Sequence, residues 1–590
     1  MPLKRSDVSS QRKWNLAEFF PSDDEFNQLY EKLEVQVYEF SLIKKKFAIE
    51  ETLSILEKKT AIERDIERLY AYAGLKRDED TSNTHYQRLS QLAEMLYVEY
   101  SVQASFVTPN ISRFPIGELK KMLCDARYEN YTVYIQDIIK LKAHILPSKQ
   151  ESILSATQTY GTMFSNAFSM FNNADLQCEM LTLPDGETIE LTHGALSLLL
   201  QHRDRATRQL AYKKFYARYV TYSNTLAAIY SGSVRRDCTN AKLRKFKSAL
   251  ECKLKADNID PIVHANLLTT VEGHLNLLKD YATLRKTALK LDELHFYDLY
   301  VPIEEVSDMG YDYDTAYDLV VDALKPLGDD YVSLLLEAKN AGWIDVEETE
   351  HKRSGAYSWG CYDAHPVVLL NHKPLLRDVF TIAHEMGHAL HTYLSNKHQC
   401  YEKAGYPIFL AEIASTVNEV LLLKHLMKVS KPELKVKLLS YYIEMFQTTI
   451  FRQTMFAEFE LFAHQQIESG IPLTAASLTQ KHRDIYEKYY GETLKLDEET
   501  GHEWSRIPHF YSAYYVFQYA TGLTSAVNIA EKILTVPNYA EKYLKMLSLG
   551  GSKFPNDALC VADIDLTTTK PFEFAMEVLR NAISELAKII

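Results

Sequence analysis

The chain has 590 residues, 46% of them apolar and 25% charged, which is typical of a globular protein of one very large domain or several ordinary ones. Its net charge of −13, without a balancing basic region, argues against nucleic acid as a main partner. No apolar run approaches the ~20 residues of a membrane span, and the N-terminus lacks the apolar core of a secretory signal. The seven cysteines are scattered and odd in number, as expected of reduced thiols. We therefore predict a cytoplasmic protein with neither a membrane nor a nucleic-acid partner.

The first 150 residues are predicted to be helical. An acidic start at 23–25 opens one helix, and the spacing of Ile62, Ile66 and Leu69 predicts another that ends near Gly74. The spacing of the apolar residues changes near residue 180. Segments 178–183 and 187–192 flank Pro184-Asp185-Gly186, and this pattern predicts a β-hairpin.

Helices are predicted again from 196 to 258 and from Pro261 to Leu289. Three arginines, Arg203, Arg205 and Arg208, lie on one of them. An exposed helical face is the simpler interpretation, and a clamp for a carboxylate is the alternative.

Residues 343–371 form the second β-like stretch, and it ends just before a further helix. Its segments are 343–346, 354–360 and 365–371, with Gly355 and Gly360 in a loop that is free to close. An edge strand here can pair with an extended substrate backbone. We expect substrate contacts at Gly355, Ala356, Tyr357 and His365, although an ordinary packed hairpin is the alternative.

The segment Ala383-His384-Glu385-Met386-Gly387-His388 contains a His-Glu-x-x-His sequence. Apolar residues recur around it at three- and four-residue steps, which predicts a helix that places His384 and His388 on one face, one turn apart. Two imidazoles with an open site favour zinc, and the adjacent Glu385 can act as general base on a metal-bound water. A helix that holds two histidines by chance is the alternative.

A third metal ligand is expected from another helix. Glu412 follows the turn at 405–407 and opens an apolar helix, so it can complete a two-His, one-Glu site. Glu419, seven residues on, can orient a ligand. His391 lies about 10 Å along the axis from His384, too far to share the ion easily, and is interpreted as a supporting, substrate-facing or packed residue.

The stretch 508–522 is predicted to be one unusually aromatic helix. It contains His509, Tyr511, Tyr514, Tyr515 and Tyr519. Buried hydroxyls need hydrogen-bond partners, so a purely structural role explains this segment poorly. A Tyr or His here can stabilise the oxyanion of a tetrahedral intermediate, an effect of about 3 kcal/mol.

Taken together, these motifs resemble the oligoendopeptidase F family, the bacterial-type relatives of thimet oligopeptidase and neurolysin. The resemblance covers most of the chain, and its motifs are the segments 14–16, 354–357, 369–371, 383–388, 412–415, 507–511 and 519–522. It implies a mostly α, two-lobed helical metallopeptidase with a deep central channel, a small β-sheet beside the zinc helix, and short unfolded peptides as substrates.

The resemblance also implies the roles of individual residues. His384, His388 and Glu412 would bind one zinc ion, Glu385 would be the base, and His509 with a tyrosine would stabilise the intermediate. Phe517 stands where family members often have Tyr, and Tyr514 stands where Phe is common. The choice between Tyr514 and Tyr515 therefore stays open.

We predict a zinc-dependent oligoendopeptidase with an N-terminal region at 1–204 and a catalytic region at 205–590, both walling one channel. One alternative is a metallocarboxypeptidase, in which Arg506 or the arginines near 205 hold the substrate carboxylate. The other is a non-catalytic peptide-binding scaffold of the same shape, although the intact metal and base residues speak against it.

Overall fold

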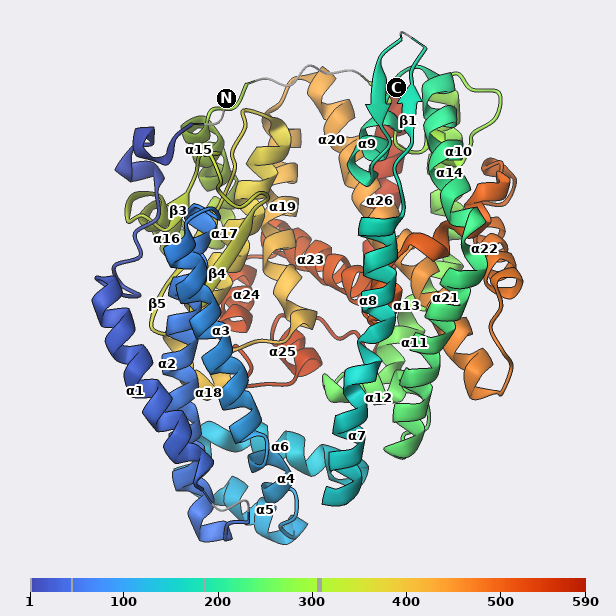
Figure 1. The fold of residues 1–590 in the computed structure, drawn as a ribbon. Coiled ribbons are helices and arrows are strands. Elements are labelled where there is room, and N and C mark those ends of the chain that lie inside the picture. Colours follow the sequence, from blue (N-terminus) through green and yellow to red (C-terminus); the bar gives the residue numbers. More distant parts are fainter. Residues whose placement is uncertain (1–2, 44–45, 185, 305–309) are drawn as a thin grey trace. The chain divides into compact units, whose positions relative to one another are not determined.

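The computed structural model describes residues 3–43, 46–184, 186–304 and 310–590 (Figure 1). Helices dominate the described residues, and the strands form only two small sheets. The mostly α fold class is thus confirmed. The lobes and the channel stay predictions, as does the boundary between residues 204 and 205.

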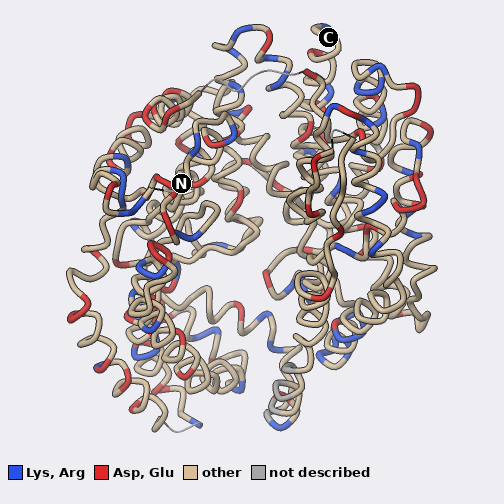
Figure 2. The backbone as a smooth tube through the Cα atoms, turned by 45° about the horizontal axis from the view of Figure 1, so that its top comes forward, with Lys and Arg blue, Asp and Glu red and all other residues tan. Residues whose placement is uncertain are grey.

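The chain divides into two compact units, each assembled from separate stretches of sequence. Unit 1 comprises 1–145, 308–425 and 525–564, and unit 2 comprises 146–307, 426–524 and 565–590. Acidic and basic residues are interspersed along the helices of both units (Figure 2). No helix of the described residues has the length and apolar content needed to cross a bilayer.

Unit 1 contains the three-stranded sheet and most of the N-terminal helices. Its elements are α1 (Asp23–Ser41), α2 (Thr52–Glu79), α3 (Thr84–Ala104), α4 (Val107–Ile111), α5 (Ile116–Cys124), α6 (Thr132–Leu141), α15 (Tyr313–Leu324), α16 (Asp329–Asn340), β3 (Ile344–Asp345), β4 (Tyr357–Cys361), β5 (Ala364–Leu369), α17 (Leu376–His398), α18 (Tyr401–Ala404), α24 (Tyr539–Leu547) and α25 (Pro555–Val561). The helices α19 (Ile408–Val429) and α23 (Phe517–Thr535) have residues in both units.

Unit 2 contains the hairpin and the remaining helices. Its elements are α7 (Ser148–Gly161), α8 (Met163–Met170), β1 (Met180–Thr182), β2 (Thr188–Glu190), α9 (His193–Leu199), α10 (Arg205–Thr221), α11 (Ser223–Leu243), α12 (Ala249–Ala256), α13 (Pro261–Gly273), α14 (Leu275–Ala288), α20 (Pro432–Met445), α21 (Arg452–Glu468), α22 (Ala475–Tyr490) and α26 (Lys570–Ile589). β1 pairs antiparallel with β2, which confirms the predicted hairpin; Asp185 of its turn lies outside the described residues.

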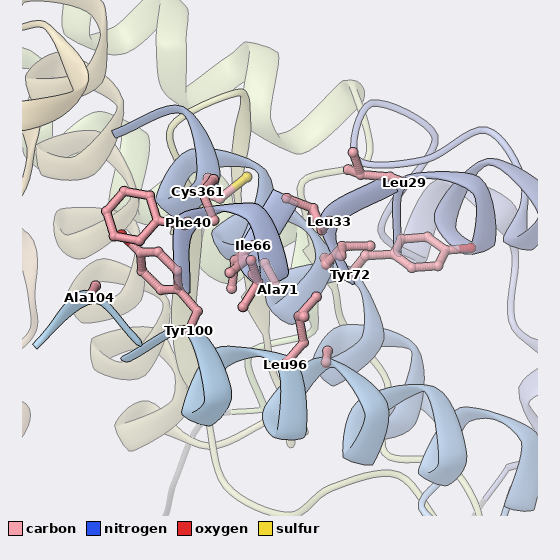
Figure 3. Close-up of a cluster of buried hydrophobic side chains, with 14 of the residues drawn as sticks. Leu29, Leu33, Phe40, Ile66, Ala71, Tyr72, Leu96, Tyr100, Ala104 and Cys361 are labelled. Carbon is pink, nitrogen blue, oxygen red and sulfur yellow. The ribbon is translucent and has the colours of Figure 1, made fainter. Parts of the chain in front are cut away.

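A hydrophobic core joins α1, α2 and α3 to the sheet of unit 1 (Figure 3). Leu33 of α1, Ile66 of α2 and Leu96 of α3 are buried in it, and Cys361 brings the end of β4 into the same cluster. Burying side chains of this size stabilises the unit by about 1.5–3 kcal/mol each. This core fixes β4 against α2.

Helix α2 corrects one prediction, because it does not end near Gly74 but continues to Glu79. Gly74 lies where the helix meets the ring of Trp359 in β4. A Cβ atom at this glycine would lie only 2.9 Å from Trp359 Cη2. The glycine therefore permits close packing of α2 on the strand and does not terminate the helix.

The three-stranded sheet has the order β3-β5-β4, with β3 parallel and β4 antiparallel to β5. Tyr357 pairs with Leu369 and Trp359 with Val367, and the register shifts between Trp359 and Cys361. Both β4 and β5 pack against α17. The predicted small sheet beside the motif helix is thus confirmed, and β4 is one of its edges.

The aromatic stretch 508–522 is not one helix, so that prediction is wrong. Pro508–Tyr511 is a short 3₁₀ helix, and α23 begins only at Phe517. Tyr514 lies between them with φ +53°, in the left-handed region that a tyrosine rarely adopts. The buried Glu460 accepts a hydrogen bond from the Tyr514 backbone N–H at 2.6 Å, and this contact holds the break in place.

Candidate metal centre

The predicted motif helix is α17, and its apolar face is buried. Val379, Ala383, Met386 and Leu390 lie in the interior of unit 1. The side chains of His384 and His388 are more open, 28% and 19% exposed. The predicted spacing therefore places both imidazoles together at the solvent-accessible side of a firmly packed helix.

Three ligand atoms converge at this side of α17. His384 Nε2 lies 3.1 Å from His388 Nε2, and Glu412 Oε2 of α19 lies 3.5 Å from the first and 3.6 Å from the second. These residues form the one group of His, Cys, Asp and Glu in the described chain with metal-ligand spacing. Ligands of a tetrahedral ion with bonds of about 2.0–2.1 Å would lie roughly 3.3 Å apart. The donor set and its spacing therefore fit a zinc-sized ion.

Glu419 fixes the orientation of His384. Its Oε1 lies 2.5 Å from His384 Nδ1, which leaves Nε2 free to face the other ligands. Burial opposes protonation of His384, but the hydrogen bond to Glu419 and the charges of Glu385 and Glu412 outweigh it and raise the pKa of His384 to about 9. The same negative potential attracts a metal cation.

Glu385 lies next to this group and is buried, with 7% of the residue exposed. Burial raises the pKa of its carboxyl above the ordinary value, although the two histidines oppose the shift. A carboxylate held away from water beside two imidazoles has the proton affinity that a general base needs. Its position next to His384 was predicted from the sequence, but its burial was not.

The close approach of α19 to α17 brings Glu412 to the histidines. A Cβ atom at Gly387 would lie 2.5 Å from Ser415 Cα, so the two backbones meet at this glycine. The fully buried Asn418 donates a hydrogen bond from Nδ2 to the Ala383 carbonyl at 3.1 Å and contacts Tyr331 Oη. Sequence reasoning missed both Gly387 and Asn418, although a glycine between two ligands of one helix is a detectable signal of close packing.

His391 is a buried residue that packs against Tyr406. Its ring stacks on Tyr406, with centroids 3.7 Å apart, and the residue is almost fully buried. Burial lowers the pKa of His391 to about 3, so the side chain is neutral. Of the three roles considered for it, this environment favours packing.

The residues predicted to contact substrate lie in two different environments. Gly355, with φ +87°, has open space beside it, and its carbonyl accepts a hydrogen bond from Asn371 Nδ2 at 2.8 Å. Ala356 and Tyr357 are half-buried, and Tyr357 donates to Asp78 Oδ2 at 2.9 Å. His365 is instead buried, with its ring stacked on Trp343 at 5.2 Å. We therefore do not include His365 in the proposed substrate contacts.

The predicted oxyanion residues lie in unit 2. The rings of His509 and Tyr515 are parallel, 5.8 Å apart, and Tyr519 Oη lies 3.4 Å from His509 Nε2. Tyr514 is instead buried, 1% exposed, and packs against the rings of His264 and His464. The burial of Tyr514 favours Tyr515 as the tyrosine that stabilises the oxyanion. Contact of either residue with a substrate at the metal stays a prediction.

The arginines considered for binding a substrate carboxylate are engaged inside unit 2. Arg208 is buried and pairs with Asp298 at 2.6 Å, which corrects its predicted place on an exposed face. Arg205 binds the same carboxylate at 3.0 Å. Arg506 donates to Tyr216 Oη at 2.7 Å and to Glu503 at 2.8 Å.

The family model of peptidase family M3 matches residues 198–578, which is well over half of the chain. The chain belongs to peptidase family M3. A second model, described as Oligopeptidase F, matches residues 111–177. This places the chain in the oligoendopeptidase F branch of the family, as the sequence motifs indicated.

Relatives that match over the full length of the chain agree with this family assignment. Oligopeptidase PepF of Bacillus subtilis is 37% identical, over 99% of this chain and 88% of the relative. The oligoendopeptidase F homolog of Lactococcus lactis is 35% identical, over 100% of this chain and 99% of the relative. Family membership and the His-His-Glu group together indicate a metallopeptidase.

Solved structures share the fold. Oligoendopeptidase-F from Enterococcus faecium is 33% identical, with a TM-score of 0.73 over 96% of this chain and 99% of the other. A protein from Chlamydophila abortus, proposed to be a peptidase, is also 33% identical and has a TM-score of 0.93 over 100% of both chains.

Proposed function

We propose that the chain is a zinc-dependent oligoendopeptidase that hydrolyses internal bonds of short peptides. The observation that carries the proposal is the triangle of His384 Nε2, His388 Nε2 and Glu412 Oε2, with sides of 3.1 to 3.6 Å. Two imidazole nitrogens and one carboxylate oxygen are the ligand set of hydrolytic zinc sites, and they leave one position open.

His384, His388 and Glu412 would hold the zinc ion. When bound, zinc supplies a Lewis acid that acidifies water and polarises the scissile carbonyl. Glu419 supports the site by fixing the tautomer and the ring orientation of His384 through the 2.5 Å contact at Nδ1.

Glu385 is proposed as the residue that moves the proton. Its buried carboxylate accepts a proton from the attacking water and then delivers this proton to the nitrogen of the leaving amine. Burial beside the histidines supports this role, because it raises the proton affinity of the carboxylate.

The edge of β4 is proposed to bind the substrate backbone. Gly355, Ala356 and Tyr357 lie at the start of this strand, which has a sheet partner on one side only. An extended peptide can add to such an edge through main-chain hydrogen bonds. His509 and Tyr515 are proposed to stabilise the oxyanion; their parallel rings and the burial of Tyr514 support this choice.

Short peptides are proposed as substrates because the relatives are named oligopeptidases and oligoendopeptidases. A cytoplasmic location is proposed because none of the seven cysteines forms a disulfide among the described residues. A carboxypeptidase is less well supported, since the arginines considered for its substrate carboxylate already bind Asp298 and Glu503.

Cleavage of a ten-residue quenched fluorescent peptide, blocked at both ends, tests the proposal. The wild type is compared with Glu385→Gln, and the zinc content of both proteins is measured. We expect internal cleavage by the wild type and a loss of ~10³-fold or more in a variant that keeps its zinc. A zinc-loaded wild type that leaves a varied panel of blocked peptides uncut would contradict endopeptidase activity.

A further inference from the structure

Unit 1 contains a cavity of about 460 Å³ that the proposed mechanism does not use. Its walls come from α2, α6, α17, α18 and the end of β4. A second cavity of about 550 Å³ adjoins it, because Glu63, Glu67 and Tyr401 line both. We name the two together the acidic aromatic pocket.

Tyrosines and one tryptophan form most of the apolar wall of this pocket. Tyr131, Tyr134 and Tyr401 line the first cavity, and Tyr97 and Trp359 line the second. Aromatic faces attract cations that have shed part of their water, and neighbouring carboxylates add to this attraction. The lining therefore matches an organic cation better than an apolar group.

The carboxylates of the pocket are not all neutralised by the chain itself. Lys59 binds both oxygens of Glu63, at 2.6 and 2.7 Å. Glu67 and Glu402 form no ion pair with any described residue. The pocket thus retains two carboxylates that form no ion pair among the described residues, although the charge of Arg64 acts on Glu67. Glu67 is half-buried and lines both cavities.

The pocket begins one helical turn beyond the metal group. Thr392 of α17 lines it and lies four residues after His388, about 6 Å further along the helix. Tyr406, which also lines it, stacks on His391 and contacts Thr392 Oγ1 through its hydroxyl at 2.8 Å. Two residues of an extended peptide span about 6.6 Å. A side chain near the scissile bond could therefore reach the pocket.

We propose that the acidic aromatic pocket binds a cationic group of the peptide substrate, a guanidinium or an ammonium, and so favours peptides with a basic residue near the scissile bond. This inference rests on the proposed function, because it takes the ligand to be a peptide lying at the metal. Glu402 and the ionised form of Glu67, which an approaching cation favours, supply the charge. The ring of Trp359, which belongs to β4, lines the wall.

A guanidinium suits this lining in particular. Its planar fork presents donors to a carboxylate, and its face stacks on aromatic rings. Lys59 is not itself the cation that neutralises Glu67, since its ammonium pairs with Glu63 and lies 6.0 Å from the Tyr134 ring centroid. Glu67 is therefore the carboxylate that an incoming cation would meet.

Binding of blocked ten-residue peptides to the Glu385→Gln variant tests this inference without cleavage. A single arginine is moved along the peptide, and each peptide is paired with its citrulline counterpart, which has nearly the same shape but no charge. We expect about tenfold tighter binding of arginine at one position. The added substitution Glu67→Gln should bring that ratio close to one.

Two further variants sharpen the test. Glu402→Gln should also reduce the arginine preference, whereas Glu94→Gln, an exposed carboxylate on α3 outside the pocket, should retain it. Peptides with a free N-terminus are compared with acetylated ones. A preference for the free amine that Glu67→Gln abolishes would identify the peptide N-terminus as the source of the cation.

The proposal would be overturned if the arginine and citrulline peptides of every pair bound with equal affinity and if a free N-terminus did not change the affinity either. An arginine preference that survives both Glu67→Gln and Glu402→Gln would overturn it as well. Failure of the proposed function looks different: the wild type would cleave none of these peptides, while the Glu67-dependent preference in binding would remain.

Discussion

Gly387 of α17 and Ser415 of α19 bring the backbones of these two helices into direct contact. A Cβ atom at Gly387 would lie 2.5 Å from Ser415 Cα and 2.7 Å from the Ala414 carbonyl oxygen. Backbone atoms cannot give way as the end of a side chain can. The glycine between the two histidines therefore sets the distance at which Glu412 approaches them.

Gly387→Ala is expected to lower metal affinity, because the added methyl group pushes α19 away from α17. Such overpacking costs about 1–3 kcal/mol in stability. Zinc affinity and the denaturant midpoint measure the two effects. Gly117→Ala is the control, since an added Cβ at this helical glycine would have no atom within 4 Å apart from its chain neighbours and its own helix backbone. Unchanged zinc affinity in Gly387→Ala would contradict the packing argument.

Glu419→Gln is expected to weaken metal binding by about 10–100-fold, because the amide orients the His384 ring less strongly than the carboxylate does. The 2.5 Å contact with Nδ1 is the basis for this prediction. Competition with a zinc-binding dye measures the affinity. Because Glu419 is not one of the three converging ligands, the variant should still bind one ion. Affinity equal to that of the wild type would show that the contact is not needed.

Glu460→Ala is expected to lower kcat, because it removes the acceptor that holds the Tyr514 backbone N–H at 2.6 Å. An unpaired buried donor costs about 1–3 kcal/mol, so the left-handed turn before Tyr515 should loosen. Glu460→Gln keeps an acceptor oxygen and is the matched control. Equal kcat in the alanine and glutamine variants would show that this turn does not position the proposed oxyanion residues.

The pH dependence of stability tests the environment of Glu67. Burial raises the pKa of its carboxyl to about 7; the Tyr362 backbone N–H opposes this shift, and the charge of Asp363 adds to it. A carboxyl with a raised pKa in the folded state destabilises that state as pH rises from about 4.5 to about 7. The titratable and charged groups that act on it or line the same two cavities are Lys59, Glu63, Arg64, Tyr70, Tyr97, Tyr100, Tyr131, Tyr134, Cys361, Tyr362, Asp363, Tyr401, Glu402 and Tyr406.

Glu67→Gln is therefore expected to be more stable than the wild type at pH 8, by on the order of 1–3 kcal/mol. The difference should shrink toward pH 5, where the wild-type carboxyl is protonated. Denaturant midpoints of both proteins at the two pH values measure it. A stability difference that is the same at pH 5 and pH 8 would contradict the raised pKa.

The local parts of the candidate site could be predicted from the sequence. The three- and four-residue spacing of apolar residues around His384 and His388 predicts their helix and their shared face. The turn before Glu412 predicts the start of a second helix. These features depend on neighbours within a few residues of the chain.

The parts that depend on distant residues could not be predicted. The break at Tyr514 is held by Glu460, which lies 54 residues earlier in the chain. Helix α2 continues through Gly74 because Trp359, from a distant strand, packs there. Arg208 is buried because Asp298, 90 residues away, neutralises it. In each case a tertiary contact outweighs the local preference.

Anomalous diffraction from crystals of the protein, at energies just above and below the zinc edge, tests the central claim most directly. The account predicts one zinc peak within about 2.0–2.2 Å of His384 Nε2, His388 Nε2 and a Glu412 oxygen. The peak should vanish in His388→Ala. A zinc peak bound by other residues, or an anomalous signal at this site from a different metal, would contradict the proposed zinc centre.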